Sequence, residues 1–133
     1  MLVYRVENPA KGEGLWRDFE GNLNPVFDKL SEGLCRSLLM PHTPEVYKAD
    51  GKSWFSAAPS KETLKHWFSK QDIIELIQLG YGVYEFDVKD ERKISDFEVI
   101  FTRDNIISQT TINMNEIWEN AKNTQVKAFF SER

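Results

Sequence analysis

Residues 81–88, Tyr-Gly-Val-Tyr-Glu-Phe-Asp-Val, decide the fold class of this 133-residue chain. From residue 83 onward, two sets of residues alternate along the sequence. The sets are Val83, Glu85 and Asp87, and Tyr84, Phe86 and Val88. Because successive residues of a β-strand face opposite sides, this alternation predicts a strand. The charged run at residues 89–93 predicts an exposed connection to the strand that follows.

Shorter strand patterns lie on both sides of this stretch. Apolar and β-branched residues form brief runs at residues 2–6, 54–56, 98–102 and 106–111. The polar residues Arg103, Asp104 and Asn105 predict a turn that joins the last two runs.

Two helices are predicted between the runs at 54–56 and 81–88. Ser60 and Ser69 are expected as their N-caps, and Gly80 is expected to end the second helix. Apolar residues recur at helical spacing in this region and are expected to face a common core. These residues are Leu64, Trp67, Phe68, Ile73, Ile74 and Ile77. A third, shorter helix is predicted from Pro25 to Gly33, because Asn24 and Pro25 supply an N-cap and a first helical residue.

Together these elements predict an α+β fold, in which helices are inserted between the strands of a mostly antiparallel, split β core. A chain of 133 residues can bury one core but is too short for two. We therefore expect one domain over residues 1–133, with residues 123–133 as a loosely ordered tail.

The composition indicates a compact acidic protein, with 41% hydrophobic residues and a formal net charge of −4. This charge argues against non-specific binding to nucleic acid or to an anionic membrane. No apolar stretch approaches the roughly 20 residues that span a bilayer, and no signal pattern opens the chain. Cys35 is the only cysteine, which fits a reducing compartment and disfavours a metal site. We expect a cytoplasmic protein without a metal cofactor.

Three polar residues stand inside strand-like runs and could carry chemistry. Arg5 lies in Leu-Val-Tyr-Arg-Val, Ser56 in Trp-Phe-Ser-Ala, and Glu98 in Asp-Phe-Glu-Val-Ile-Phe. On neighbouring strands, a guanidinium, a hydroxyl and a carboxylate could bind a dinucleotide phosphate, order its ribose and stabilise a cationic sugar.

In this order and with these flanks, the three residues resemble the arginine, serine and glutamate motifs of the mono-ADP-ribosyltransferase family. The resemblance covers residues 2–112 and implies an ADP-ribosyltransferase-like fold that uses NAD as its substrate. It implies that Arg5 holds the phosphate, that Ser56 supports the glutamate and the ribose, and that Glu98 contacts the ribose. Glu98 and Ser56 are then the catalytic candidates.

Aromatic residues are further candidates for binding NAD. Tyr4 precedes Arg5 in its motif, and Trp16 and Tyr47 lie in predicted loops where their rings could stack on nicotinamide or adenine. Asp96, two residues before Glu98, is a weaker candidate for orienting the acceptor of ADP-ribose. The acceptor itself, a host protein or a nucleic acid, is not specified by the sequence.

Structural roles remain open for all three motif residues. Arg5 could be a salt-bridge partner, and Ser56 could end a strand before a helix. Glu98 could face solvent while Phe97 and Val99 face the core.

The compact chain starts with Tyr-Arg-Val at residues 4–6 and contains Trp-Phe-Ser at residues 54–56 and Trp-Phe-Ser-Lys at residues 67–70. In these features it also resembles uncharacterised small phage proteins, which suggests a place in the host cytoplasm and an action on a host factor. Its motifs then allow two functions. The first is ADP-ribosyl transfer to a host macromolecule or NAD hydrolysis. The second is a non-catalytic acidic protein that binds and inhibits a host partner, such as a defence component.

Overall fold

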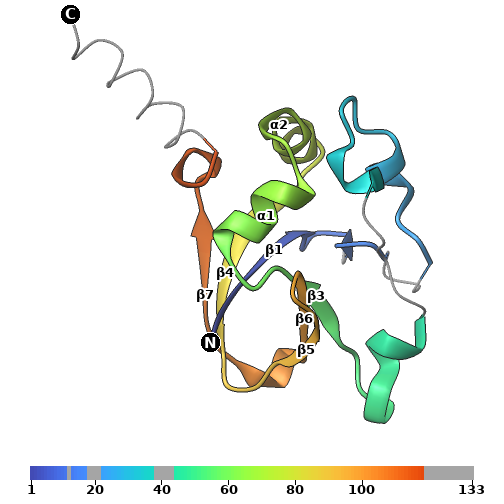
Figure 1. Ribbon diagram of the computed structural model, residues 1–133, viewed down its shortest axis with the longest axis vertical. Helices are drawn as coiled ribbons and strands as arrows, with labels where there is room; N and C mark the ends of the chain where they lie inside the picture. The colour runs from blue at the N-terminus through green and yellow to red at the C-terminus, as the bar shows by residue number, and fades with distance from the viewer. Residues whose placement is uncertain (12, 18–21, 38–43, 119–133) are drawn as a thin grey trace, which may run out of the picture.

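The computed structural model describes residues 1–11, 13–17, 22–37 and 44–118, and Figure 1 shows their arrangement. Within these ranges the strands form two antiparallel sheets. The four-stranded sheet has the order β2 (Glu13–Gly14), β1 (Leu2–Asn8), β4 (Gly82–Val88) and β7 (Ile106–Ile112). The three-stranded sheet has the order β3 (Phe55–Ala57), β6 (Glu98–Phe101) and β5 (Arg92–Ser95). The predicted α+β class with antiparallel strands is confirmed. The expected tail at residues 123–133 lies outside the described residues.

The two sheets are joined where β1 passes β3. The backbone amide of Tyr4 donates to the carbonyl oxygen of Ala58 at 2.9 Å. In return, the backbone amide of Ala58 donates to the carbonyl oxygen of Tyr4 at 2.7 Å. Strands that start 53 residues apart in the chain are thereby held side by side. The residues of β1 and β3 consequently meet at this junction.

Both predicted helices form, and their caps are the predicted ones. Helix α1 (Lys61–Trp67) begins after Ser60, whose side chain accepts from the amide of Thr63. Helix α2 (Lys70–Gln78) begins after Ser69, which forms a reciprocal capping box with Asp72. Gly80 follows α2 with a φ of +96°, a left-handed conformation that glycine adopts without strain.

Short 3-10 helices complete the described chain. They are η1 (Pro25–Asp28), η2 (Leu34–Ser37), η3 (Pro44–Gly51), η4 (Arg103–Asn105) and η5 (Met114–Glu116). Within η3 the backbone is kinked, because Ala49 and Asp50 have non-helical conformations. Asn24 caps η1 as predicted, but the helix stops at Asp28 instead of continuing to Gly33. A 3-10 helix has poorer hydrogen-bond geometry than an α-helix, so such helices are usually short.

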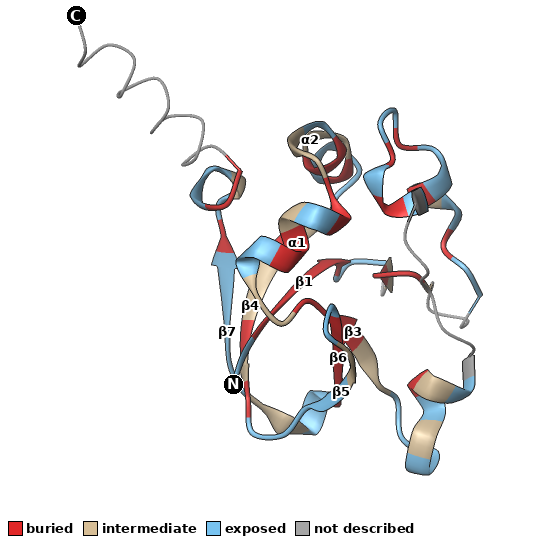
Figure 2. Ribbon diagram, in the orientation of Figure 1, coloured by how far each residue is buried: buried red, intermediate tan, exposed pale blue. Residues whose placement is uncertain are grey.

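The four-stranded sheet separates two apolar clusters, and Figure 2 shows the buried segments on both sides of β1. The helix-side cluster joins this sheet to α1 and α2, and includes Tyr4, Val6, Trp16, Phe27, Leu64, Trp67, Phe68, Ile73, Leu76 and Val83. The sheet-side cluster joins it to the three-stranded sheet and consists of Val3, Ala57, Phe86, Val88, Val99 and Phe101. Val3 and Val6 therefore lie on opposite faces of β1.

One part of the predicted core is wrong. Trp67 and Phe68 are buried as expected, but Ile77 is 43% exposed and Ile74 is only half-buried. Ile73 and Leu76 are the residues of α2 that face the core. Residues 73, 74, 76 and 77 are all apolar, and both 73 with 76 and 74 with 77 have helical spacing. The periodicity alone therefore did not decide which of these two pairs faces the core.

Candidate functional site

Strand β1 carries two charged residues toward the three-stranded sheet. Arg5 and Glu7 share a face with Val3, because residues two apart in a strand point the same way. Both are buried. A buried charge is costly unless it is paired and hydrogen-bonded, so the partners of these two residues matter.

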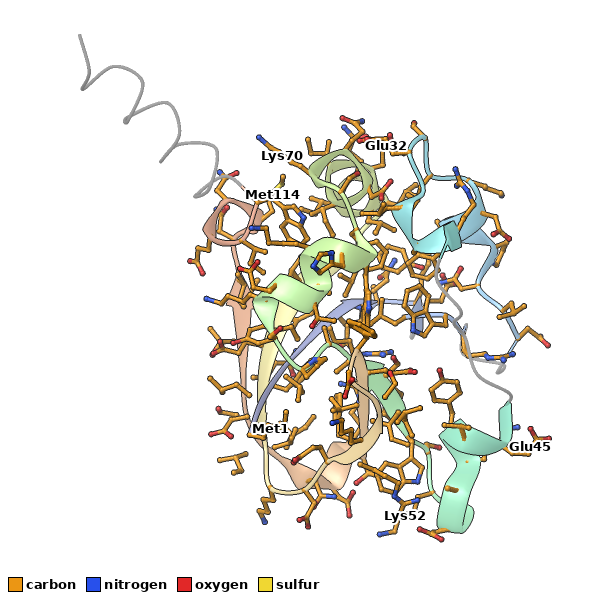
Figure 3. The ribbon with its side chains drawn as sticks, viewed as in Figure 1. Met1, Glu32, Glu45, Lys52, Lys70 and Met114 are labelled. Carbon is orange, nitrogen blue, oxygen red and sulfur yellow. The ribbon has the colours of Figure 1, made fainter. Side chains whose placement is uncertain are left out.

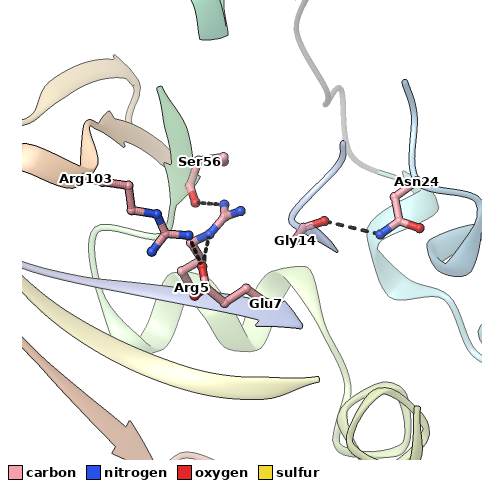
Figure 4. Close-up of polar contacts among 6 residues, drawn as sticks. All are labelled: Arg5, Glu7, Gly14, Asn24, Ser56 and Arg103. Atoms are coloured by element: carbon pink, nitrogen blue, oxygen red, sulfur yellow. Dashed lines mark hydrogen bonds and ion pairs between the residues drawn. The ribbon is translucent and has the colours of Figure 1, made fainter. Parts of the chain in front are cut away.

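Arg5 has two buried hydrogen-bond partners, which Figure 4 shows. Its Nε donates to Oε1 of Glu7 at 2.8 Å, and its Nη1 donates to the carbonyl oxygen of Ser56 at 2.7 Å. Burial lowers the pKa of Arg5, and the negative charge of Glu7 opposes that shift. Because an arginine pKa is so high, Arg5 stays charged.

Glu7 binds a second arginine as well. Nη2 of Arg103 donates to the same Oε1 of Glu7 at 2.7 Å. Burial by itself would raise the pKa of Glu7, but the charges and hydrogen bonds of Arg5 and Arg103 outweigh it and hold that pKa below its usual range. The carboxylate is therefore ionised between two guanidinium groups.

Ser56 links this ion cluster to Glu98. Its carbonyl oxygen accepts from Arg5, while its hydroxyl donates to Oε2 of Glu98 at 2.6 Å. The hydroxyl of Tyr47, from η3, donates to the same oxygen at 2.9 Å. Nε1 of Trp16 donates to the Ser56 hydroxyl at 3.1 Å, which orients that hydroxyl toward the carboxylate.

The structure thus brings Arg5, Ser56 and Glu98 together from β1, β3 and β6. It does not leave Glu98 facing solvent: Glu98 is 0% exposed, and Phe97 is 60% exposed. That structural alternative is wrong because β6 is the middle strand of its sheet and both of its faces are covered. Figure 3 shows side chains filling the space between the two sheets.

Three other residues that the sequence suggested for binding NAD or its acceptor lie away from this cluster or make other contacts. Tyr4 faces the helix-side cluster, and its hydroxyl donates to Glu85 at 3.0 Å; burial is the main cause that raises its pKa to about 12. Trp16 is buried in that same cluster, so within the described structure its ring packs on protein side chains such as Phe68. Asp96 lies in the turn before β6 and forms an ion pair with Lys93 at 3.0 Å.

Sequence reasoning missed three residues of this cluster. Glu7 could have been found, because it follows Arg5 by two residues and so shares its strand face. Arg103 gave no such signal, since it lies 96 residues from Glu7 in a polar turn. Gly14 gave none either: a Cβ atom there would lie 2.0 Å from Nη2 of Arg5, so glycine leaves the room that the guanidinium fills.

A cavity lies beside Trp16. It has a volume of about 350 Å³, and its lining includes Trp16, Phe27 and Cys35. This volume falls at the lower end of the usual range for ligand pockets, about 300–1,000 Å³. Burial is the main cause that raises the pKa of the Cys35 thiol to about 11, so the thiol is not a poised nucleophile.

The fold and the site define a small α+β protein in which two antiparallel sheets bury an arginine, a serine and a glutamate in mutual contact. The chain belongs to the bacteriophage T4 Y00F protein family, whose model matches residues 1–115. This membership confirms the expected similarity to small phage proteins. No curated protein and no solved structure matches the chain. In the described part of the chain, every helix is too short or too polar to cross a membrane.

Proposed function

We propose that this protein binds NAD and cleaves the bond between nicotinamide and ribose, passing ADP-ribose to a host macromolecule or to water. The observation that carries the proposal is the continuous contact from Arg5 through Ser56 to Glu98. These residues come from three different strands, and their motifs resemble those of the ADP-ribosyltransferase family in order and in flanking residues. The ADP-ribosyltransferase-like fold is part of the same proposal.

Each residue has a role that its chemistry supports. Loss of nicotinamide builds positive charge on the ribose, and the carboxylate of Glu98 opposes that charge. Ser56 and Tyr47 donate hydrogen bonds to one oxygen of this carboxylate, which fixes its orientation. Arg5 supplies a planar, permanently charged group for the diphosphate.

Binding of NAD requires the site to open. Glu98, Ser56 and Arg5 are 0%, 2% and 4% exposed, so a dinucleotide cannot reach them as they stand. Tyr47 contacts Glu98 from η3, which joins the site from outside both sheets. Movement of η3 is therefore the simplest way to expose the carboxylate, and closure over bound NAD would exclude water.

Incubation with NAD labelled in its adenylate half tests the proposal. Nicotinamide release measures cleavage, and label on a macromolecule from bacterial host lysate distinguishes transfer from hydrolysis to free ADP-ribose. We expect release by the intact protein and its loss in Glu98→Gln. Absence of release with and without lysate would contradict the proposal.

A non-catalytic protein that binds and inhibits a host partner is the second candidate, and the burial of all three motif residues favours it. In that case the polar cluster holds the two sheets together, and exposed apolar residues such as Phe97 and Ile107 contact the partner. A folded protein that neither cleaves nor binds NAD, but captures a host protein through these residues, would support this candidate.

A further inference from the structure

The ion cluster at Glu7 contains more positive than negative charge. One carboxylate oxygen, Oε1 of Glu7, accepts from both Arg5 and Arg103, at 2.8 and 2.7 Å. The three groups together carry one excess positive charge. A cluster of this kind attracts an anion, provided that one of its cations can be reached.

Arg103 is the cation that can be reached. Its side chain is 42% exposed, whereas that of Arg5 is 5% exposed. A guanidinium carries five N–H donors, so the bond to Glu7 leaves donors on Arg103 for a ligand. An anion that approaches from solvent therefore meets Arg103 before it meets Arg5.

A shared aromatic ring holds the two guanidinium groups near each other. The Cζ atoms of Arg103 and Arg5 lie 4.3 and 5.2 Å from the centre of the Phe55 ring. Contact with an aromatic face and a bond to the same carboxylate reduce the freedom of the long Arg103 side chain. Less conformational entropy is then lost when a ligand binds.

We infer that Arg103 is the solvent-facing half of a two-arginine clamp for the diphosphate of an adenine dinucleotide. Arg103 binds one phosphate at the mouth of the site, and Arg5 binds the other once the site opens. This inference rests on the proposed function, because it takes its ligand from the NAD site. It adds a residue that lies outside the arginine, serine and glutamate motifs.

Arg92 offers a closely matched control. Its side chain is 46% exposed, and its Cζ atom lies 4.4 Å from the centre of the Trp54 ring. Its Nη2 forms an ion pair with Oδ2 of Asp50 at 2.8 Å. Exposure, ring contact and ion pair are thus nearly the same as at Arg103. The difference is the partner, since Asp50 is itself exposed and Glu7 is buried beside a second arginine.

Titration calorimetry of the full chain with ADP, ADP-ribose and adenosine tests the clamp. We expect Arg103→Gln to weaken ADP and ADP-ribose binding by roughly 10- to 100-fold, the usual effect of losing a hydrogen bond to a charged group. Arg92→Gln should change both affinities less than about twofold. Adenosine, which lacks phosphate, should bind all three proteins equally. Should Arg103→Gln fail to fold, Arg103→Lys replaces it, with several-fold weaker binding expected from loss of the planar fork.

Several results would overturn the clamp. They are equal effects of the Arg103 and Arg92 substitutions, ADP binding no tighter than adenosine binding, and no binding of ADP by the intact protein. Nicotinamide release, measured on the same proteins, separates the two proposals. Cleavage that survives with unchanged ADP-ribose affinity in Arg103→Gln overturns the clamp alone. Arg103-dependent ADP binding without cleavage overturns the enzyme alone.

Discussion

Both faces of the four-stranded sheet bury apolar residues, but only the face toward the three-stranded sheet also buries the cluster of charged groups around Glu7. On β1, Tyr4 and Val6 enter the helix-side cluster, which is almost wholly apolar. Arg5 and Glu7 alternate with them along the strand and lie on the other face, among the buried polar groups near Ser56. Burial of apolar surface stabilises the fold, whereas burial of ion pairs often contributes little net stability. The larger apolar cluster on the helix side is therefore expected to be the main source of stability. The face toward the three-stranded sheet adds a smaller apolar cluster and also holds the charged and polar groups suited to function.

Truncation on the helix side should have the largest effect. Trp67 is buried and its ring lies 5.4 Å from that of Trp16, so Trp67→Ala should lower the free energy of unfolding by about 3–5 kcal/mol. Chemical denaturation measures the change. Ile77→Ala, on the exposed face of α2, is the control and should cost less than about 0.5 kcal/mol. A cost below about 1 kcal/mol for Trp67→Ala would show that this cluster is not the main source of stability.

Substitution of Glu98 should affect activity much more than binding. Glu98→Gln keeps an oxygen that can accept from Ser56 and Tyr47, but it removes the charge that opposes the ribosyl cation. Turnover in nicotinamide release should fall on the order of a hundredfold or more, roughly 3 kcal/mol. Affinity for NAD should change far less. Arg5→Lys should show the reverse pattern, since it loses the planar fork. Unchanged release in Glu98→Gln would remove Glu98 from the mechanism.

A side chain at Gly14, on the neighbouring strand β2, should moderately reduce stability because it would crowd Arg5. A Cβ atom in Gly14→Ala would displace Nη2 of Arg5 and so strain its bonds to Glu7 and Ser56. We expect a loss of about 1–3 kcal/mol in the free energy of unfolding, together with weaker NAD binding. Gly82→Ala, which would meet the half-buried Tyr84 ring instead, should cost less. Equal costs for the two variants would show that Arg5 moves freely.

Low pH should lower the free energy of unfolding, because protonation of Glu7 removes its ion pairs with Arg5 and Arg103. Arg5 and Arg103 hold the pKa of Glu7 below its value of 4.5 in the unfolded chain. The folded state therefore gains stability from Glu7 above about pH 4.5, and loses it as the pH falls through the lower folded pKa. Unfolding curves between pH 7 and pH 3 should show this loss, and Glu7→Gln should show a smaller one. Identical profiles for the two proteins would contradict the role of Glu7.

Local signals in the sequence were sufficient for most elements and for one part of the site. Alternation from residue 83 to residue 88 predicted β4, and Ser60 and Ser69 predicted the starts of both α-helices. The sequence motifs single out Arg5, Ser56 and Glu98 as a set, and the structure places the three residues in contact and buries them. The hydrophobic pattern could not determine which face of α2 packs against the core, because four neighbouring apolar residues fit helical spacing equally well.

What the sequence alone determined is the content of the strands and helices and the chemical groups that β1, β3 and β6 carry. These follow from periodicity and capping, which depend on residues close together in the chain. Tertiary structure decided that Glu98 is buried, that Arg103 shares Glu7 with Arg5, and that Gly14 makes room for a guanidinium. Each of these depends on segments distant in sequence that pack together, and no local pattern encodes which of them will meet.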